Sequence, residues 1–419
     1  MVHVIIHRMF SLPVSLPVRG ADGLAKRALY GGVERQRLSS QSVKAHLRNA
    51  TGLNSSMADL AKELGTEMSV RSALIGPRRI ATELKHREFT EDQANLWAER
   101  VMALFQTGKE KAPAKAVKKS KKAKAEDDEA DVEATEEDAS ETASASAAGR
   151  QILTLGEKEI AALVDVVSAL IKANVPPSEM RDLIEKTTKQ KNHPKPVRDA
   201  LAALHAMRSH AGLDGALFGR MATGIALSRV DSAVHVGHAL TTHPIQSSVD
   251  FFSAQDQLLD REAGETGGAH IGSRELTTGV FYLPVVIDVK QVRKNFAGWT
   301  NKEIAKVVGW LVKTLAMFTP AAMLGSTAPF PDPGEVIVEI TSGQPVNAMG
   351  AFEKPVAPTL EATIAAFDNH MQRVWSMIGH PSKVMRLSQY IDAKATQPAV
   401  QRLAEAVANA VESAPHASE

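Results

Sequence analysis

The stretch from about Gly108 to Arg150 constrains the fold of this chain more than any other feature of its sequence. It opens with KEKAPAKAVKKSKKAKA and changes at once to EDDEADVEATEEDASETASASAAG. Because it has almost no apolar groups to bury, it cannot offset the entropy lost on ordering, so 108–150 is predicted to be a disordered surface loop. At 419 residues the chain is too long for one small core, so one elaborated domain or two to three units are expected.

Helical patterns lie on both sides of this loop. One apolar stripe at helical spacing consists of Ile160, Leu163, Val164, Val167, Leu170 and Ile171. The prolines at 176 and 177 are expected to end that helix. Residues 54–105 are also mostly helical in pattern, with breaks at Gly65 and Gly76-Pro77. The range 51–214 is thus predicted to be one helical insertion that contains the loop.

Strand patterns occur outside this insertion. The segments MVHVIIHRMF (1–10), VFYLPVVIDV (280–289) and EVIVEI (335–340) are rich in β-branched and other apolar residues, which predicts strands. Long helices are predicted between the last two strands and after them, and the tail beyond about Ser413 is expected to fray. This arrangement predicts an α+β fold, in which a sheet domain is interrupted by helices.

The N-terminal segment is strongly basic, although the net charge of the chain is only +1. From Met1 to Arg48 the acidic residues are Asp22 and Glu34, whereas the basic residues are Arg8, Arg19, Lys26, Arg27, Arg35, Arg37, Lys44 and Arg48. Such an excess is typical of a surface that binds a polyanion, although charged faces of ordinary proteins look similar.

Other features exclude several classes of protein. The chain has no cysteine, so it has no disulfides, thiolate metal sites or cysteine nucleophiles. No apolar run approaches the roughly 20 residues of a membrane helix, and no membrane association is expected. A cytoplasmic location is predicted.

The segment LYGGVERQRLSSQSVKAHLRNA (29–50) has the pattern of a phosphate-binding helix start. Its glycine pair predicts a tight turn, and a serine of the SSQS run is placed to cap a helix beginning near Gln41. Lys44 and Arg48 are four residues apart and would share one helical face. Free N–H groups beside cations suit phosphate, but a capped helix whose cations only face water fits the same pattern.

Two later segments together suit a long hairpin that returns to the sheet. Residues 215–258 are dense in Gly, Ser, Thr and His and contain Met221 and Phe252, while 265–288 leads from a glycine-rich turn into a strand. Large apolar side chains in such a segment would stack against nucleobases or, in the plainer interpretation, belong to the core.

Signals of catalysis are weak. His235, His238, His243 and His270 have no carboxylate at metal-ligand spacing, and HExxH, GxxxxGK[ST] and GxSxG are all missing from the sequence. No metal, no cofactor and no enzymatic activity are predicted.

Several long blocks occur in an order that resembles one family. They are GGVERQRLSSQSVKAHLRNA, LFGRMAT, VDSAVHVGHALTTH, VDFFSAQDQL, GGAHIGSRELTTGVFY and NAMGAFEK. Together they resemble the CasC-type backbone subunit of the CRISPR type I-E Cascade complex. The resemblance is clear over about 1–50 and 215–290, weaker to about 375, and poor over 51–210.

The resemblance implies an RRM-like (ferredoxin-like) palm with a helical fingers insertion and a thumb hairpin. In this chain the palm would be 1–50, 215–244 and 276–413, the fingers 51–214, the thumb 245–275, and 414–419 a frayed tail. The family implies non-catalytic subunits that polymerise head-to-tail along CRISPR RNA, in an antiviral ribonucleoprotein with large, small and guide-end subunits. The guide is then displayed for pairing with target DNA.

The resemblance also implies roles for individual residues. The implied RNA contacts are Arg19, Lys26, Ser39, Gln41, Lys44, Arg48 and Arg220. Met221 and Phe252 match apolar residues that wedge beside a flipped base, and the possible DNA contacts of the fingers are Lys118, Lys119, Lys121 and Lys122. One member of the family has tryptophan where Phe251 stands and more lysine in the glycine turn, where Val33 is found, which puts the RNA contact at that turn in doubt.

A metal-dependent RNA endonuclease is the alternative. Related backbone subunits of type III complexes cut RNA with a loop aspartate, and Asp22 lies in a loop of the corresponding region. It has no evident second carboxylate for a metal and is equally placed to pair with Arg19.

Overall fold

The chain divides into two compact units. The computed structural model describes residues 2–50, 56–105, 152–206, 211–220, 229–255, 268–320 and 324–414. One unit, here called the sheet unit, comprises Met1–Thr66, Ala216–Phe218 and Ser232–Glu419; the other, the helical unit, comprises Glu67–Gly215 and Gly219–Asp231. The helical unit overlaps most of the predicted insertion 51–214.

The sheet unit is built on one antiparallel sheet. Its strands follow the order β11-β10-β1-β9-β7-β3-β2, and β6 and β8 also pair with β9. Their bounds are β1 (His3–Ser15), β2 (Arg27–Tyr30), β3 (Val33–Leu38), β6 (Val234–Val236), β7 (Ala239–Thr241), β8 (Gln246–Gln255), β9 (Gly268–Asp288), β10 (Glu335–Thr341) and β11 (Lys383–Arg386). The predicted α+β fold is confirmed, while an RRM-like palm stays a prediction.

Strand β9 organises this sheet because it is much longer than its neighbours. Along one edge it pairs with β1, from His3↔Asp288 to Ser15↔Thr277. Along the other edge it pairs in turn with β8, β7 and β6. Pro284 has no N–H to donate, and its carbonyl oxygen accepts from the N–H of Gly237 in the gap between β6 and β7.

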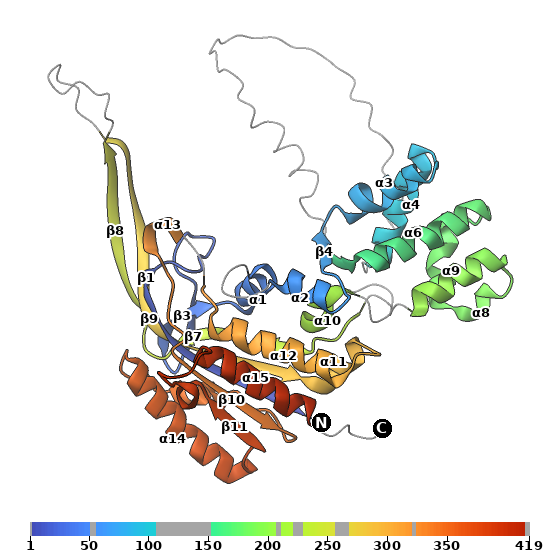
Figure 1. Cartoon of the computed structure of the whole chain (residues 1–419). Helices are drawn as coiled ribbons and strands as arrows, with labels where there is room; N and C mark the ends of the chain where they lie inside the picture. The colour runs from blue at the N-terminus through green and yellow to red at the C-terminus, as the bar shows by residue number, and fades with distance from the viewer. Residues whose placement is uncertain are drawn as a thin grey trace, which may run out of the picture. The chain divides into compact units, whose positions relative to one another are not determined.

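Helices cover both faces of the sheet (Figure 1). Successive residues of β1 point to opposite faces. Arg8 donates to the carbonyl oxygens of Leu315 and Phe318 at the end of α12, whereas Met9 packs with Phe367 and Met371 of α14. The elements are α1 (Ser40–Asn49), α2 (Met57–Glu63), α11 (Val289–Asn295), α12 (Asn301–Ala316), α13 (Leu324–Thr327), η4 (Ala348–Phe352), α14 (Leu360–Ile378), η5 (Leu387–Tyr390) and α15 (Ala399–Glu412).

The helical unit has a core of its own. The predicted stripe on α6 is confirmed: Ile160, Leu163 and Leu170 are buried in that core, together with Trp97 and Val101 of α4. The sequence did not predict the two-stranded β4–β5 sheet. The elements are β4 (Ser69–Ser72), η1 (Gly76–Ile80), α3 (Ala81–His86), α4 (Glu91–Leu104), β5 (Leu153–Gly156), α6 (Glu157–Lys172), η2 (Pro177–Glu179), α7 (Met180–Glu185), α8 (Thr187–Gln190) and α9 (Lys195–Ala206), and α10 (Gly212–Phe218) has residues in both units.

Candidate nucleic-acid interface

Helix α1 begins at its predicted serine cap. Ser39 has an extended backbone, and its Oγ accepts a hydrogen bond from the N–H of Ser42 at 3.4 Å. The Nδ1 of His238, just before β7, accepts from the N–H of Ser40 at 3.0 Å. The N–H of the exposed Gln41 has no acceptor among the described residues. With respect to the described residues, the first turn therefore presents one open donor of the kind that binds a phosphate oxygen.

Lys44 and Arg48 are held together on one aromatic ring. The Lys44 Nζ lies 5.8 Å, and the Arg48 Cζ 5.6 Å, from the ring centroid of Phe218 at the end of α10. Both cations are half-buried, and burial, followed by the charge of Arg48, lowers the pKa of Lys44. A cation pair fixed in this way has less side-chain freedom to lose on binding than two mobile side chains would.

The two arginines of β3 have different surroundings. Arg35 is fully buried and donates to the carbonyl oxygens of Thr241 at 3.1 Å and Phe352 at 2.9 Å. Arg37 is half-buried, and its Nε has no partner in the part of the chain that the structure describes. Burial first, and then the charge of Arg37, lowers the pKa of His238. Arg37, unlike Arg35, thus adds positive charge near the start of α1.

The predicted glycine turn between β2 and β3 is packed against the protein. Gly31 and Gly32 have φ values of 61° and 78°, as a tight hairpin turn requires. A Cβ on Gly31 would lie 1.7 Å from the carbonyl oxygen of Glu353. Two of the sequence blocks, the glycine turn and NAMGAFEK, are therefore in contact in the fold.

The loop between β1 and β2 contains Arg19, Lys26 and Asp22. Arg19 is exposed and forms a backbone bridge with Ala25, while Lys26 is half-buried. The exposed Asp22 accepts from the N–H of Leu24 through Oδ1 at 3.1 Å, which stabilises the turn. Across the described ranges no group of three or more metal-ligating side chains is found.

One face of the β8–β9 hairpin holds Phe252 in place. Its ring lies over Gly272, where a Cβ would be 2.6 Å from the ring, and the Arg274 Cζ lies 5.5 Å from the ring centroid. Arg274 also donates to Asp250 at 2.9 Å. These contacts leave Phe252 37% exposed.

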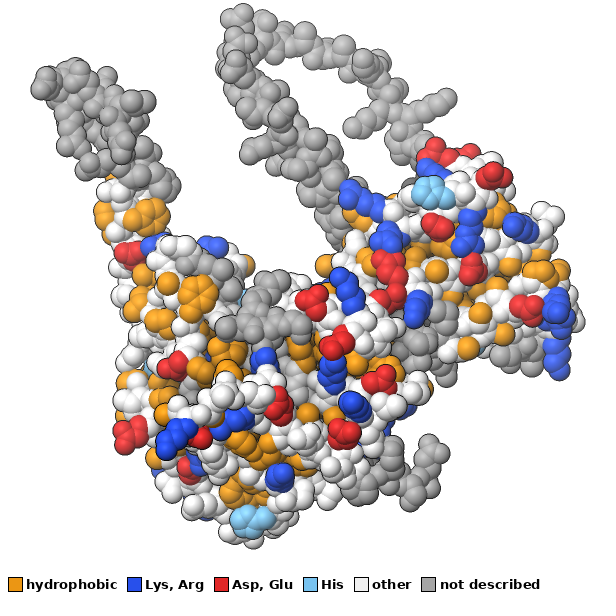
Figure 2. Space-filling model, in the orientation of Figure 1, with side chains coloured by type: hydrophobic (Ala, Val, Ile, Leu, Met, Phe, Trp, Pro, Cys, Tyr) orange, Lys and Arg blue, Asp and Glu red, His pale blue; other side chains and the backbone are white. Residues whose placement is uncertain are grey.

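The opposite face of the hairpin is more apolar and more open. Val249 is 76% exposed, Phe251 68% and Ile271 62%, and Figure 2 shows hydrophobic side chains on the hairpin. The strand register places these three on one face, because Phe251 pairs with Ser273 and Ser253 with Ile271. Phe251 therefore projects further than Phe252, the residue singled out by the resemblance.

Arg220 has an intramolecular partner. Its guanidinium donates to both carboxylate oxygens of Glu159, at 2.7 and 2.9 Å, and to the carbonyl oxygen of Thr154. Only 6% of the residue is exposed. These bonds join the start of α6 to β5 within the helical unit. The predicted RNA contact of Arg220 stays a prediction.

Some predicted features lie outside the described residues. They are the 108–150 loop, the tail beyond Ala414, Met221, Lys118, Lys119, Lys121 and Lys122.

A basic cluster between α7 and α9 was not predicted from the sequence. The run KTTKQKNHPKPVR has no acidic residue, and its exposed cations are Lys186, Lys189, Lys191, Lys195 and Arg198. Asp182 accepts from Lys186 at 3.0 Å and from Lys189, and among the described residues the other three cations have no ion-pair partner. Figure 2 shows this group of Lys and Arg at the α8 end of the helical unit. The charge run itself was the signal that could have revealed it.

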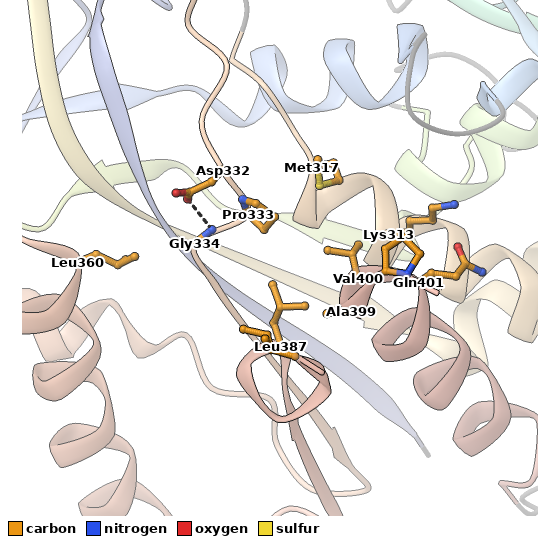
Figure 3. A pocket seen from close by; sticks show the side chains of 12 residues that line it. Lys313, Met317, Asp332, Pro333, Gly334, Leu360, Leu387, Ala399, Val400 and Gln401 are labelled. Carbon is orange, nitrogen blue, oxygen red and sulfur yellow. Dashed lines mark hydrogen bonds between the residues drawn. The ribbon is translucent and has the colours of Figure 1, made fainter. Parts of the chain in front are cut away.

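The sheet unit also contains a cavity of about 560 Å³. Its lining is mostly apolar and includes Met317, Leu387 and Val400 (Figure 3). The carboxylate of Asp332 at its edge accepts from the N–H of Gly334 at 2.9 Å. None of the predicted RNA-contacting residues lines this cavity.

One family model and two solved structures each match nearly the whole length of the chain. A family model described as CT1975-like protein matches residues 4–413. A structure described as "CRISPR RNA-guided surveillance complex, pre-nicking" has a chain 22% identical, covering 98% of this chain and 100% of its own, with a TM-score of 0.65. Another, "CRISPR RNA-guided surveillance complex", has a chain 16% identical, covering 97% and 99%, with a TM-score of 0.50.

Because these two chains are only 22% and 16% identical to this one, their structural likeness shows a shared fold and nothing more. No curated protein matches the chain. In the ranges that the structure describes, no helix is long and apolar enough to span a bilayer.

Proposed function

The chain belongs to the family of CT1975-like proteins, and from this premise we propose that it is a CRISPR RNA-binding subunit of a Cascade-type surveillance complex. Two chains from CRISPR RNA-guided surveillance complexes share its fold along nearly their whole lengths, which supports the proposal. The more specific proposal, carried by the sequence blocks, is the non-catalytic backbone subunit of a type I-E complex that acts in antiviral defence.

The observation that carries this proposal is the arrangement on α1. One surface of the sheet unit holds the N–H of Gln41, which has no acceptor in the described part of the chain, together with Arg37 on β3. The half-buried cations Lys44 and Arg48 on the ring of Phe218 belong to the same surface. All of these groups donate hydrogen bonds, so they suit the phosphates of any RNA sequence. Sequence would then be read by base pairing of the guide, not by the protein.

The hairpin suits the backbone role. In a head-to-tail filament each copy contacts the next through two different surfaces, and the apolar face of Val249, Phe251 and Ile271 would lie against the RNA bound by a neighbouring copy. Bases between successive hairpins would stay open for target DNA. The basic cluster Lys186–Arg198 is a further candidate for electrostatic contact with that DNA, in addition to the predicted lysines 118–122.

Co-purification tests the proposal. The chain is expressed with its neighbouring Cascade-type subunits and a CRISPR array, and nucleic acid is extracted from the purified complex. The wild type should retain RNA of uniform, spacer-like length, whereas Lys44→Glu/Arg48→Glu should lose it, because two attractive charges become repulsive to phosphate.

A charge-matched control separates a local site from general electrostatics. Lys302→Glu/Lys383→Glu changes two exposed cations on α12 and β11 of the same unit, and it should retain RNA. Equal loss in both variants would show that only net charge matters. Retention of RNA by Lys44→Glu/Arg48→Glu would remove the α1 surface from the proposal.

We also propose that the chain is not a nuclease. The oxygen of Asp22 that accepts from Leu24 serves a turn, and Asp22 has no neighbouring carboxylate in a metal-binding group among the described residues. Incubation of the purified chain with labelled RNA and magnesium should leave the RNA intact. Cleavage that disappears in Asp22→Ala would instead favour the endonuclease.

A further inference from the structure

The first turn of α1 is tied to the sheet by a histidine. A helix cannot satisfy its first N–H groups with its own carbonyls. Ser42 donates to the serine cap, and Ser40 donates across a gap of 198 residues to the Nδ1 of His238. His238 has no place in the metal or RNA-contact predictions drawn from the sequence.

This hydrogen bond fixes the state of the imidazole. A backbone N–H can only donate, so Nδ1 must hold a lone pair and the proton of the neutral ring must lie on Nε2. A charged ring, protonated on both nitrogens, cannot form this bond.

The backbone beside His238 is firmly anchored. The N–H of Gly237 donates to the carbonyl oxygen of Pro284 at 2.9 Å. A Cβ at Gly237 would lie 2.6 Å from the Pro284 ring, so the two backbones are as close as a glycine permits. The imidazole therefore extends toward α1 from a segment that is fixed on the central strand β9.

We propose that His238 is a positioning residue for RNA binding, which holds the first turn of α1 on the sheet so that the Gln41 N–H and Lys44 keep one geometry. This inference rests on the proposed RNA-binding function and adds a residue to it. His238 acts through α1, and no contact between its ring and RNA is required.

Three substitutions of His238 test whether its hydrogen-bond acceptor, and not the imidazole ring as such, is needed for RNA binding. In His238→Asn the side-chain oxygen can take the place of Nδ1, in His238→Gln it lies nearer the place of Nε2, and His238→Leu has no acceptor. The Kd of the purified full chain for a fluorescent oligouridylate should rise about three- to tenfold for the Leu and Gln variants. The Asn variant should recover most of that loss.

A double-mutant cycle separates positioning from direct contact. If His238 acts through α1, His238→Leu should cost much less in a Lys44→Ala background than in the wild type, because the cation that it positions is gone. Additive effects, or an Asn variant as weak as the Leu variant, would overturn the proposal.

Amide hydrogen exchange of the free protein keeps this inference distinct from the proposed function. The amides of Ser40 and Ser42 should exchange faster in the Leu and Gln variants than in the wild type and the Asn variant. Faster exchange with an unchanged Kd would refute positioning while leaving RNA binding intact. A wild type that binds no RNA, alone or in its complex, would refute the function itself.

Discussion

Helix α1 and the β8–β9 hairpin are both candidate RNA-contacting regions, but they offer opposite chemistry. On α1 the groups are cations and an open N–H, held by Phe218, the serine cap and His238. On the hairpin the most exposed of the described large apolar side chains are Val249 and Phe251, and the charged pair Asp250–Arg274 lies on the other face.

If the chain binds RNA as proposed, this difference would give the two regions different parts in that binding. Phosphate contacts fix where an RNA chain lies and weaken as salt rises, because bound counterions are released on association. Stacking of bases on apolar rings depends little on salt and little on sequence. The salt dependence of binding can therefore tell which region a substitution has damaged.

The largest expected effect belongs to α1. Lys44→Ala/Arg48→Ala should weaken oligouridylate binding by about ten- to a hundredfold at moderate salt and lower the slope of log K against log salt by about 1.4, since two phosphate contacts are lost. Titrations at several salt concentrations measure both quantities. An unchanged slope would mean that these cations serve the fold and not the RNA.

The next largest effect on RNA binding is expected at Phe251, and its neighbour Phe252 provides the comparison. Phe251→Ala should weaken RNA binding in the assembled complex by about 1–2 kcal/mol without altering the salt slope, because a stacking surface is lost. Phe252→Ala should affect RNA less, since its ring already packs on Gly272 and Arg274. The opposite order would restore Phe252 as the main apolar contact.

A smaller effect concerns pH. Burial lowers the pKa of both His238 and His243 below 6.5. As pH falls through 6.5 the unfolded chain takes up these protons first, so stability is fully present above 6.5 and is lost between 6.5 and each lowered pKa. Thermal unfolding from pH 7.5 to 5 should show this loss.

The two histidines should differ in that experiment. His243 is buried at the base of the hairpin, where its Nε2 accepts from the N–H of Val280, whereas His238 is exposed. His243→Asn should therefore flatten the acid limb of the stability profile more than His238→Asn does. An equal change in both variants would mean that the burial of the imidazole does not determine how much each histidine contributes to the pH dependence.

The smallest effect is expected for the ion pair on the hairpin. Asp250→Asn removes a charge from a half-exposed pair, which is worth about 0.2–1 kcal/mol of stability. RNA binding at α1 should not change. A large loss of RNA binding in this variant would show that the hairpin face of Phe252 is more important than its exposure suggests.

Local signals made part of this structure predictable. The serine cap, the glycine turn and the strands near 280–289 and 335–340 depend on neighbouring residues, and all were found where the sequence predicts them. The sequence of β8 also indicates that its side chains alternate between two faces. It does not indicate which of these faces packs against the rest of the protein. That depends on Gly272 and Arg274, which belong to the other strand.

Contacts between distant residues made the rest unpredictable. The sequence pattern does not distinguish Arg35 from its neighbour Arg37, and both belong to the basic N-terminal segment. In the structure Arg35 is buried, and its acceptors are carbonyl oxygens 206 and 317 residues away. Arg220 likewise pairs with Glu159, 61 residues earlier. A buried arginine and an exposed one have the same local sequence pattern, because only the fold supplies the acceptors.

The continuity of β9 has a mechanical consequence. One uninterrupted strand forms half of the hairpin and then continues between β1 and the strands β6 and β7 (Figure 1). A force pulling along the hairpin would load the β1–β9 hydrogen bonds in shear, all at once, instead of unzipping them one by one. The described part of the hairpin is therefore continuous with the centre of the sheet, and a load on β9 would reach Pro284, whose carbonyl oxygen holds Gly237.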